Sequence, residues 1–287
     1  MLSSLAAVLF DGFAYGMLLF LLSVGLSVTL GMMNFVNLAH CAFAAVGGYC
    51  TVTLVQRFGW PFLASLPIAF LMAALVSVVL ERTLYRHLYR SSDLDQCLFT
   101  IGIVFISVAA FAWFYTTEQQ SARVPDYLRG TVQLAGINLA LYRLFLIVVG
   151  LAITGLLVFL LERTRFGAQV RAAVDNQRMA RGLGIDVDRA FMFTFALGGG
   201  LAGLGGALAI EVIGLDPAFA LTYLVYVLIV VAVGGLGSIG GSFAAAAVLG
   251  ISDMAGKYYF PWLGAFLIYL VMVALLMWRP AGLFGRR

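Results

Sequence analysis

The sequence predicts an all-α fold, a polytopic bundle of about 8–10 transmembrane helices, some of them broken. Hydrophobic residues make up 63% of the 287 residues and charged residues 10%, and the mean hydropathy is +1.04. Soluble domains carry about 25% charged residues. The apolar residues also come in blocks of roughly 20, the length that crosses a bilayer as a helix, whereas an outer-membrane barrel would show alternating segments of roughly 10 residues. An ordinary soluble protein is therefore excluded.

Nine predicted spans follow one another along the chain. Two crossings are expected in 9–55, three in the stretch that begins at 190, and single crossings at about 60–80, 97–115, 141–161 and 261–278. Polar or glycine-rich breaks separate the crossings within a stretch, and they lie at 31–40, 216–217 and 234–241. No independent soluble domain fits between the spans, so residues 1–287 are expected to form a single transmembrane domain.

Basic residues gather in three of the segments between spans. Segments 81–96, 162–189 and 279–287 carry three, six and three of them, twelve of the seventeen in the chain. Because Lys and Arg are enriched in cytoplasmic loops, these segments and the C-terminus are expected in the cytoplasm, with loop 116–138 and the N-terminus outside. The net charge of +4 then reflects topology, and no nucleic-acid partner is expected.

The segment 162–189 is the one long charged stretch on the basic side that does not span the membrane. Read as a helix it is amphipathic, and Gly182 with Gly184 can end it. The apolar residues expected on one side are Val170, Ala173, Val174, Ala180 and Leu183. The pattern fits a short helix lying under the membrane domain, and it fits an ordinary basic loop equally well.

Three polar residues interrupt the first apolar stretch. Asn34, Asn37 and His40 are spaced three apart, which on a helix places them along one face. Polar groups at membrane depth are costly unless they face a bundle interior or an aqueous cavity. The pattern favours a translocation path or its gate, and hydrogen bonding between helices without solute contact stays open as the alternative.

Motifs for catalysis and for nucleotide or metal binding are missing from the sequence. The single lysine is Lys257, and no G-x-x-x-x-G-K-[ST] motif occurs, so any ATP that drives the protein must be bound and hydrolysed by a partner chain. Two G-x-G-x-x-G matches, at 198–203 and 235–240, are assigned to close helix packing. Two histidines and three isolated cysteines make no metal or nucleophilic set. We therefore expect no enzyme activity, metal or cofactor in this chain.

Three functional classes compete with a transport subunit. A secondary transporter driven by an ion gradient would need an acidic residue deep in a span, and Glu211 is the carboxylate that comes closest. An intramembrane enzyme would need a nucleophile with a base, or a metal set. A non-transporting assembly protein would have little use for polar breaks, which are expensive without a cavity to line. A transport subunit is favoured over all three.

Four stretches resemble one known family, in the right order along nearly the whole chain. The first is GMMNFVNLAH at 31–40, followed by the glycine pair and tyrosine at 47–49. The others are RAAVDNQRMARGLGI at 171–185, AVGGLGSIGG at 232–241 and RPAGLFG at 279–285. They are similar to the signature stretches of the LivH-type permeases of branched-chain amino acid ABC importers.

The resemblance implies an all-α permease of the bacterial inner membrane that works with partner chains. These would be a second, LivM-like permease or a second copy of this chain, two cytoplasmic ATP-binding subunits and a periplasmic solute-binding protein, all within or beside membrane lipid. ATP would be bound by the ATPase subunits and not by this chain. The family also includes permeases for urea, amides and other amino acids, so the solute stays open.

The resemblance also implies roles for particular residues. The ATPase-coupling residues within 162–189 would be Arg171, Asp175, Asn176, Arg178, Arg181 and Gly184. Asn34, Asn37 and His40 would belong to the broken segment near the translocation path. Cys41 follows His40 where the family commonly has a glycine, so local packing is expected to differ there.

Overall fold

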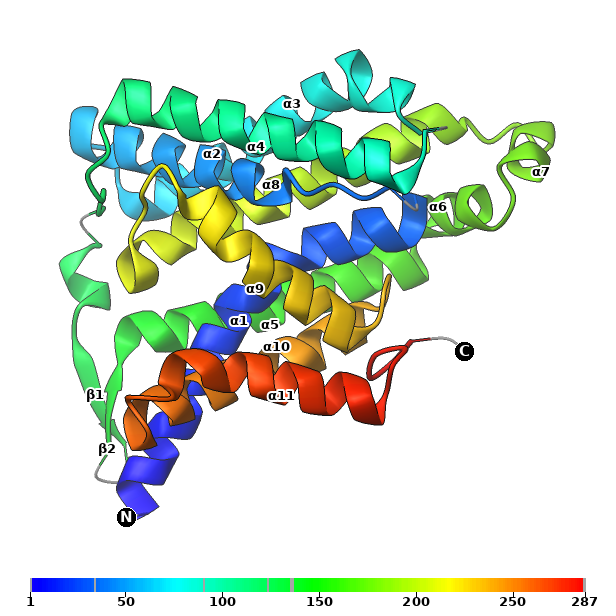
Figure 1. Ribbon diagram of the computed structural model, residues 1–287. Coiled ribbons are helices and arrows are strands. Elements are labelled where there is room, and N and C mark those ends of the chain that lie inside the picture. Colours follow the sequence, from blue (N-terminus) through cyan, green and yellow to red (C-terminus); the bar gives the residue numbers. More distant parts are fainter. Residues whose placement is uncertain (1, 34, 90, 123, 135–136, 286–287) are drawn as a thin grey trace.

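The computed structural model describes residues 2–33, 35–89, 91–122, 124–134 and 137–285. This part of the chain forms a bundle of eleven α-helices with one small β-hairpin (Figure 1). The helices are α1 (Leu2–Met33), α2 (His40–Val52), α3 (Phe62–Thr83), α4 (Asp93–Tyr115), α5 (Leu141–Arg163), α6 (Arg165–Asp175), α7 (Gln177–Gly182), α8 (Val187–Ile213), α9 (Phe219–Gly234), α10 (Ile239–Tyr259) and α11 (Gly264–Trp278). A π-helical turn, η1 (Thr53–Arg57), follows α2, and two 3-10 turns are η2 (Tyr85–His87) and η3 (Asp126–Leu128).

Each predicted span corresponds to one apolar helix, and the all-α polytopic fold is confirmed. Helices α1, α3, α4, α5, α8 and α10 are long and apolar enough to cross a membrane. Helices α2, α9 and α11 match the other three predicted spans but have 13, 16 and 15 residues. The chain is therefore a multi-pass membrane protein.

Helix α8 lies at the centre of the packing, against α1, α2 and α3. Its glycines let the neighbouring backbones approach closely, as small residues do in membrane bundles. A Cβ on Gly47 of α2 would lie 2.1 Å from the backbone oxygen of Gly203. A Cβ on Gly25 of α1 would lie 2.2 Å from the backbone oxygen of Gly198. The glycine-rich match at 198–203 therefore serves helix packing, as predicted.

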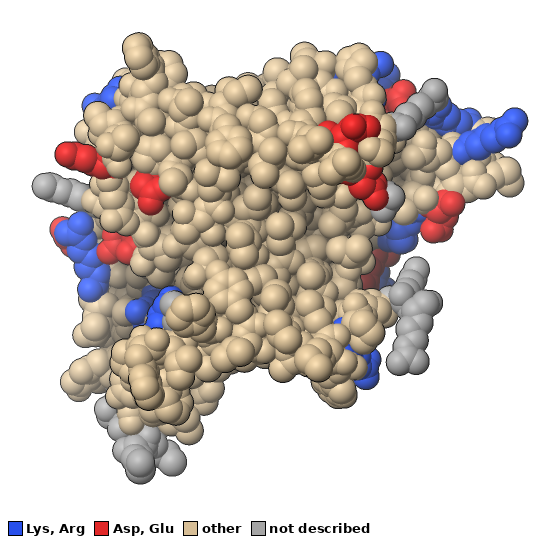
Figure 2. Space-filling view, in the orientation of Figure 1, with Lys and Arg blue, Asp and Glu red and all other residues tan. Residues whose placement is uncertain are grey.

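The two ends of the bundle differ in structure and charge. At one end, which we call the hairpin end, β1 (Thr131–Leu134) pairs antiparallel with β2 (Ile137–Ala140). At the other, the basic end, lie α6 and α7. The chain begins at the hairpin end and finishes at the basic end (Figure 1). Figure 2 shows charged side chains gathered at both ends with an uncharged surface between them, the pattern expected of a belt in contact with lipid.

Two local features differ from the sequence predictions. The β-hairpin lies in what was expected to be a plain loop at 116–138 and its continuation. The single amphipathic helix expected within 162–189 is two helices, because Asn176 has extended backbone (φ −157°, ψ 97°) and its side-chain oxygen accepts a hydrogen bond from the Met179 amide. Asparagine is a favoured N-cap residue, and this cap starts α7.

Candidate functional site

The polar break between α1 and α2 is held open by side chains of α4. Residues 35–39 are not helical, although they lie among membrane helices. The Val36 amide donates to the Gln96 side-chain oxygen (2.9 Å), and the Leu38 amide donates to the Thr100 hydroxyl oxygen (3.1 Å). Gln96 and Thr100 are both buried. Non-helical backbone at membrane depth needs such partners, because no water is present to satisfy its amides.

His40 is buried where α2 begins, against α1. Its Nε2 lies 3.1 Å from the backbone oxygen of Leu22. Since a carbonyl can only accept, this bond requires the hydrogen on Nε2. Gly25 allows the ring to come this close, because a Cβ there would lie 2.8 Å from His40 Cε1. His40 therefore joins two helices in the bundle interior.

Asn37 is also buried, and it does not share a helix face with His40. Its side-chain oxygen accepts from the Ala39 amide (3.1 Å), a local turn that replaces helical hydrogen bonding. Its side-chain nitrogen Nδ2 is buried without a hydrogen-bond partner among the described residues. Asn34 lies outside the described residues. The prediction of a common helix face for Asn34, Asn37 and His40 is thus wrong for the latter two, because the backbone between them is not helical.

An aromatic cluster connects the polar break with the basic end. Phe35 packs against Tyr85, Tyr89 and Phe195, with ring centroids 5.3, 5.6 and 5.8 Å apart. The Tyr89 hydroxyl donates to a Glu81 carboxylate oxygen (2.7 Å). Burial, together with this hydrogen bond, raises the pKa of Tyr89 above its usual range, so the hydroxyl keeps its proton and remains the donor.

The helix pair α6–α7 has a packed side and an exposed side. On the packed side, Ala173 and Ala180 are buried with Val187 and Phe191 of α8, and Met33 and Tyr89 pack against the same cluster. On the exposed side, Met179 and Leu183 are 67% and 79% accessible. Val170, Ala173 and Ala180 are buried as predicted, but Val174 of α6 and Leu183, which follows the end of α7, are exposed. The pair thus presents apolar side chains away from the bundle. Its packed side contacts Met33 and Tyr89, which lie next to the polar break.

The residues predicted to couple to an ATPase fall into two groups. Arg171 donates to the backbone oxygen of Leu161 at the end of α5, and Arg181 pairs with Asp188 (3.0 Å). Asn176 caps α7, and Gly184, at φ +80°, follows its end. Asp175 and Arg178 are exposed and have no ion pair within the described part of the chain. Among these six residues, the charges without a partner in the described part of the chain are therefore Asp175 and Arg178, whereas the other four residues shape the helix pair.

The carboxylate buried deepest in a span differs from the one predicted. Glu211 is exposed on α8. Asp253 of α10 is 1% accessible, and its carboxylate lies 2.6 Å from the Lys257 ammonium, which stands over the Tyr15 ring at 5.4 Å. A charge at this depth is expected to be paired. Among the described residues, no group of three or more His, Cys, Asp or Glu side chains could hold a metal ion.

Several residues of the site were not predicted, although the sequence contains a recognisable pattern for some of them. Gln96 and Thr100 stand four apart in an otherwise apolar span, and Asp253 and Lys257 have the same spacing, which places each pair on one helix face. The exposure of Met179 had no such signal, because an apolar side chain on an amphipathic helix is ordinarily expected on the packed face.

Comparisons with known proteins agree with this architecture. A family model described as "Branched-chain amino acid transport system / permease component" matches residues 8–276. A probable branched-chain amino acid transport permease protein LivH from Methanocaldococcus jannaschii is 29% identical over 286 residues, 94% of this chain and 90% of the relative. The high-affinity branched-chain amino acid transport system permease protein BraD from Pseudomonas aeruginosa is 23% identical, covering 97% of this chain and 95% of its own length.

A second kind of permease is also similar to this chain. The high-affinity branched-chain amino acid transport system permease protein LivM from Escherichia coli is 26% identical over 296 residues, 93% of this chain and 68% of the relative. No solved structure matches the chain significantly.

Proposed function

The chain belongs to the family of branched-chain amino acid transport permeases, and we propose that it is the membrane-spanning permease subunit of an ABC importer for branched-chain amino acids. In this proposal it lies in a bacterial inner membrane with a LivM-like permease or a second copy of itself. A periplasmic binding protein delivers the solute, and two cytoplasmic subunits bind and hydrolyse ATP. Residues around the polar break, Asn34, Asn37 and His40, belong to the path or its gate.

The observation that carries the proposal is the exposed side of α6–α7. Figure 1 shows α7 standing clear of the bundle at the basic end. Met179 and Leu183 are largely exposed there, flanked by the unpaired charges of Asp175 and Arg178. An amphipathic helix that offers apolar side chains to solvent is suited to a groove on a partner protein. The sequence has no nucleotide-binding motif of its own, so an ATPase is the partner that the proposal requires.

The packed side of α6–α7 suggests how the partner would act. Movement of this pair would displace Met33 and Tyr89, which pack on it, and Tyr89 contacts Phe35 in the polar break. Packed clusters of this kind transmit movement because they are dense and resist compression. ATP-driven closure of the partner subunits would thereby change the conformation of the break.

Capture of partner chains tests the proposal. The tagged chain, purified in mild detergent from cells that also express the importer's other subunits, should bring down two ATP-binding chains and a second permease. The double variant Met179→Asp, Leu183→Asp should weaken ATPase capture roughly thirtyfold to several hundredfold, since each anchor contributes about 1–2 kcal/mol when buried.

The control is Val132→Asp at the hairpin end, where an exposed apolar side chain, 38% accessible, is replaced without touching α7. It should leave ATPase capture unchanged. Purification of the chain alone, with uptake that follows an ion gradient and needs no ATP, would overturn the proposal in favour of a secondary transporter.

A further inference from the structure

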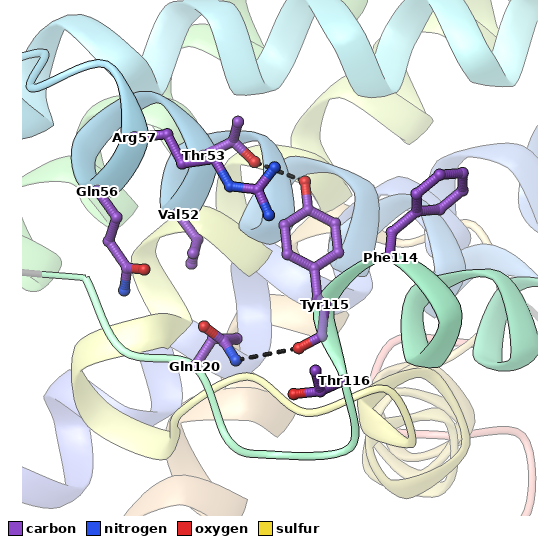
Figure 3. A pocket seen from close by; sticks show the side chains of 8 residues that line it. All are labelled: Val52, Thr53, Gln56, Arg57, Phe114, Tyr115, Thr116 and Gln120. Carbon is purple, nitrogen blue, oxygen red and sulfur yellow. Dashed lines mark hydrogen bonds between the residues drawn. The ribbon is translucent and has the colours of Figure 1, made fainter.

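A pocket of about 130 Å³ lies at the hairpin end of the bundle, between the end of α2 and the segment that follows α4 (Figure 3). Its polar wall includes Thr53 and Arg57 of η1, and Thr116 and Gln120 from the segment after α4. The Tyr115 ring lies at the centre of the view, with the Arg57 guanidinium beside it. Apolar side chains, Val52 and Phe114, complete the lining.

Arg57 is the feature that gives this pocket its chemistry. Elsewhere in the spans and loops near this end, Arg129 pairs with Asp126, Arg143 with Asp11 and Lys257 with Asp253. Within the described part of the chain, Arg57 has no such carboxylate and instead stacks on Tyr115, with the guanidinium carbon 5.5 Å from the ring centroid. A stacked guanidinium keeps its N–H groups free at the edge, and these groups match the two oxygens of a carboxylate.

Hydrogen bonds hold Tyr115, the ring against which Arg57 lies, in place. The Tyr115 and Thr53 hydroxyls are hydrogen-bonded (2.5 Å), and the Gln120 side-chain nitrogen donates to the Tyr115 backbone oxygen (3.3 Å). The Gln120 backbone is tied in turn to Leu215 through both its amide and its oxygen. Hydrogen bonds therefore fix the Tyr115 side of the pocket.

The backbone around the pocket is irregular on both sides. Arg57 and Thr53 lie on a π-helical turn, and Thr116 has φ +65°, the one positive φ of a non-glycine residue in the described chain. A positive φ is costly for a non-glycine residue, and both features occur preferentially at functional sites. Here they shape the two walls that face each other across the pocket.

We propose that the Arg57 pocket binds the α-carboxylate of the amino acid solute at the outer mouth of the permease. Arg57 binds the carboxylate, and Val52 in the lining offers an apolar contact to an aliphatic side chain. That the carboxylate belongs to a transported amino acid rests on the proposed function. The capacity of Arg57 to hold a carboxylate follows from the pocket alone.

Protection from an arginine-selective dicarbonyl reagent tests the site in the wild-type protein. Membrane vesicles that expose the hairpin end are treated with the reagent, and modification of each arginine is measured by mass spectrometry. With a dissociation constant on the order of 1 mM, leucine at about 10 mM should slow modification of Arg57 about tenfold. Leucinamide, which lacks the carboxylate, should not protect, and acetate should protect at higher concentration.

Arg129 is the internal control in the same experiment, because it lies at the same end and already pairs with Asp126. Its modification should not respond to leucine. Equal behaviour of Arg57 and Arg129, or protection of Arg57 by the solute-binding protein but not by free leucine, would overturn the proposal.

Uptake measured on the same preparation separates the two proposals. If leucine protects Arg57 but ATP-dependent leucine uptake is absent, the carboxylate site stands and the proposed function fails. If uptake is present and Arg57 is not protected, the function stands and the site fails.

Discussion

At the crossing of α2 and α8, Gly47 has no room for even a methyl group. A Cβ there would meet the backbone oxygen of Gly203 at 2.1 Å, and backbone cannot move aside as the end of a flexible side chain can. The contact brings α2, which carries His40, directly onto the central helix. Single glycines therefore set the position of the polar break.

Replacing Gly47 with alanine should destabilise the protein. We expect a loss of about 1–3 kcal/mol, because an extra methyl group in a close-packed contact forces the helices apart. The measurement is thermal unfolding in detergent. Its readout is the loss of the monodisperse peak in size-exclusion chromatography.

The matched control is Gly155→Ala in α5, where nothing lies within 4 Å of the added Cβ. Alanine is the better helix former, so this variant should be unchanged or slightly more stable. Equal destabilisation by both substitutions would contradict the packing argument.

His40 is a second residue whose role can be isolated. His40→Leu removes the donor to the Leu22 oxygen, and stability should fall by about 1 kcal/mol. Solute uptake should fall several-fold more than the amount of inserted protein. His40→Gln keeps a donor and should restore much of the uptake. Unchanged uptake in His40→Leu would make His40 a packing residue only.

At the scale of elements, α4 acts as a clamp on the non-helical segment between α1 and α2. Gln96 uses both ends of its amide: the oxygen accepts from the Val36 amide, and the nitrogen donates to the backbone oxygens of Leu88 and Ser91. One side chain thus ties the break to the loop between α3 and α4. That loop also carries Tyr89, which packs against the α6–α7 cluster.

Substitution of Gln96 should loosen this clamp. Gln96→Leu leaves the Val36 amide without its partner in a water-poor interior, which costs about 1–3 kcal/mol. Thr100→Val, of nearly the same shape, should have the same sign because it frees the Leu38 amide. Gln133→Leu on the exposed strand β1 is the control and should be neutral. The readout is thermal stability together with protease sensitivity near residues 35–39, and a neutral Gln96→Leu would show that other groups hold the break.

At the scale of the whole molecule, the two charged ends predict an orientation in the membrane. Twelve of the seventeen basic residues belong to the segments expected in the cytoplasm, and α6–α7 lies at that end. The β-hairpin, η3 and the Arg57 pocket lie at the opposite end. The proposed ATPase contact and the proposed solute contact therefore require opposite sides of the membrane.

Cysteine labelling can check this orientation. In a chain whose native Cys41, Cys50 and Cys97 are replaced by alanine, Tyr127→Cys in η3 should react with a membrane-impermeant maleimide in spheroplasts. Arg178→Cys in α7 should react only after the membrane is opened. Reaction of Arg178→Cys in sealed spheroplasts would show the opposite topology, and it would contradict both proposed contacts.

The positions of the spans and of the basic segments could be predicted from the sequence because hydropathy and charge act locally. A run of about 20 apolar residues must cross the bilayer whatever its neighbours are, and all nine predicted spans correspond to helices. The polar break at 31–40 could be located for the same reason, since polar side chains interrupt an apolar run there. The sequence by itself thus determined the fold class, the order of the elements and the place of the break.

Only the tertiary structure decided how these elements meet. The support of Val36 by Gln96 joins residues sixty positions apart, and the stacking of Arg57 on Tyr115 joins two different helices. Leu183, which was predicted on the packed side of the helix, is exposed together with Met179. Such contacts depend on the packing of distant segments, which neither periodicity nor composition records.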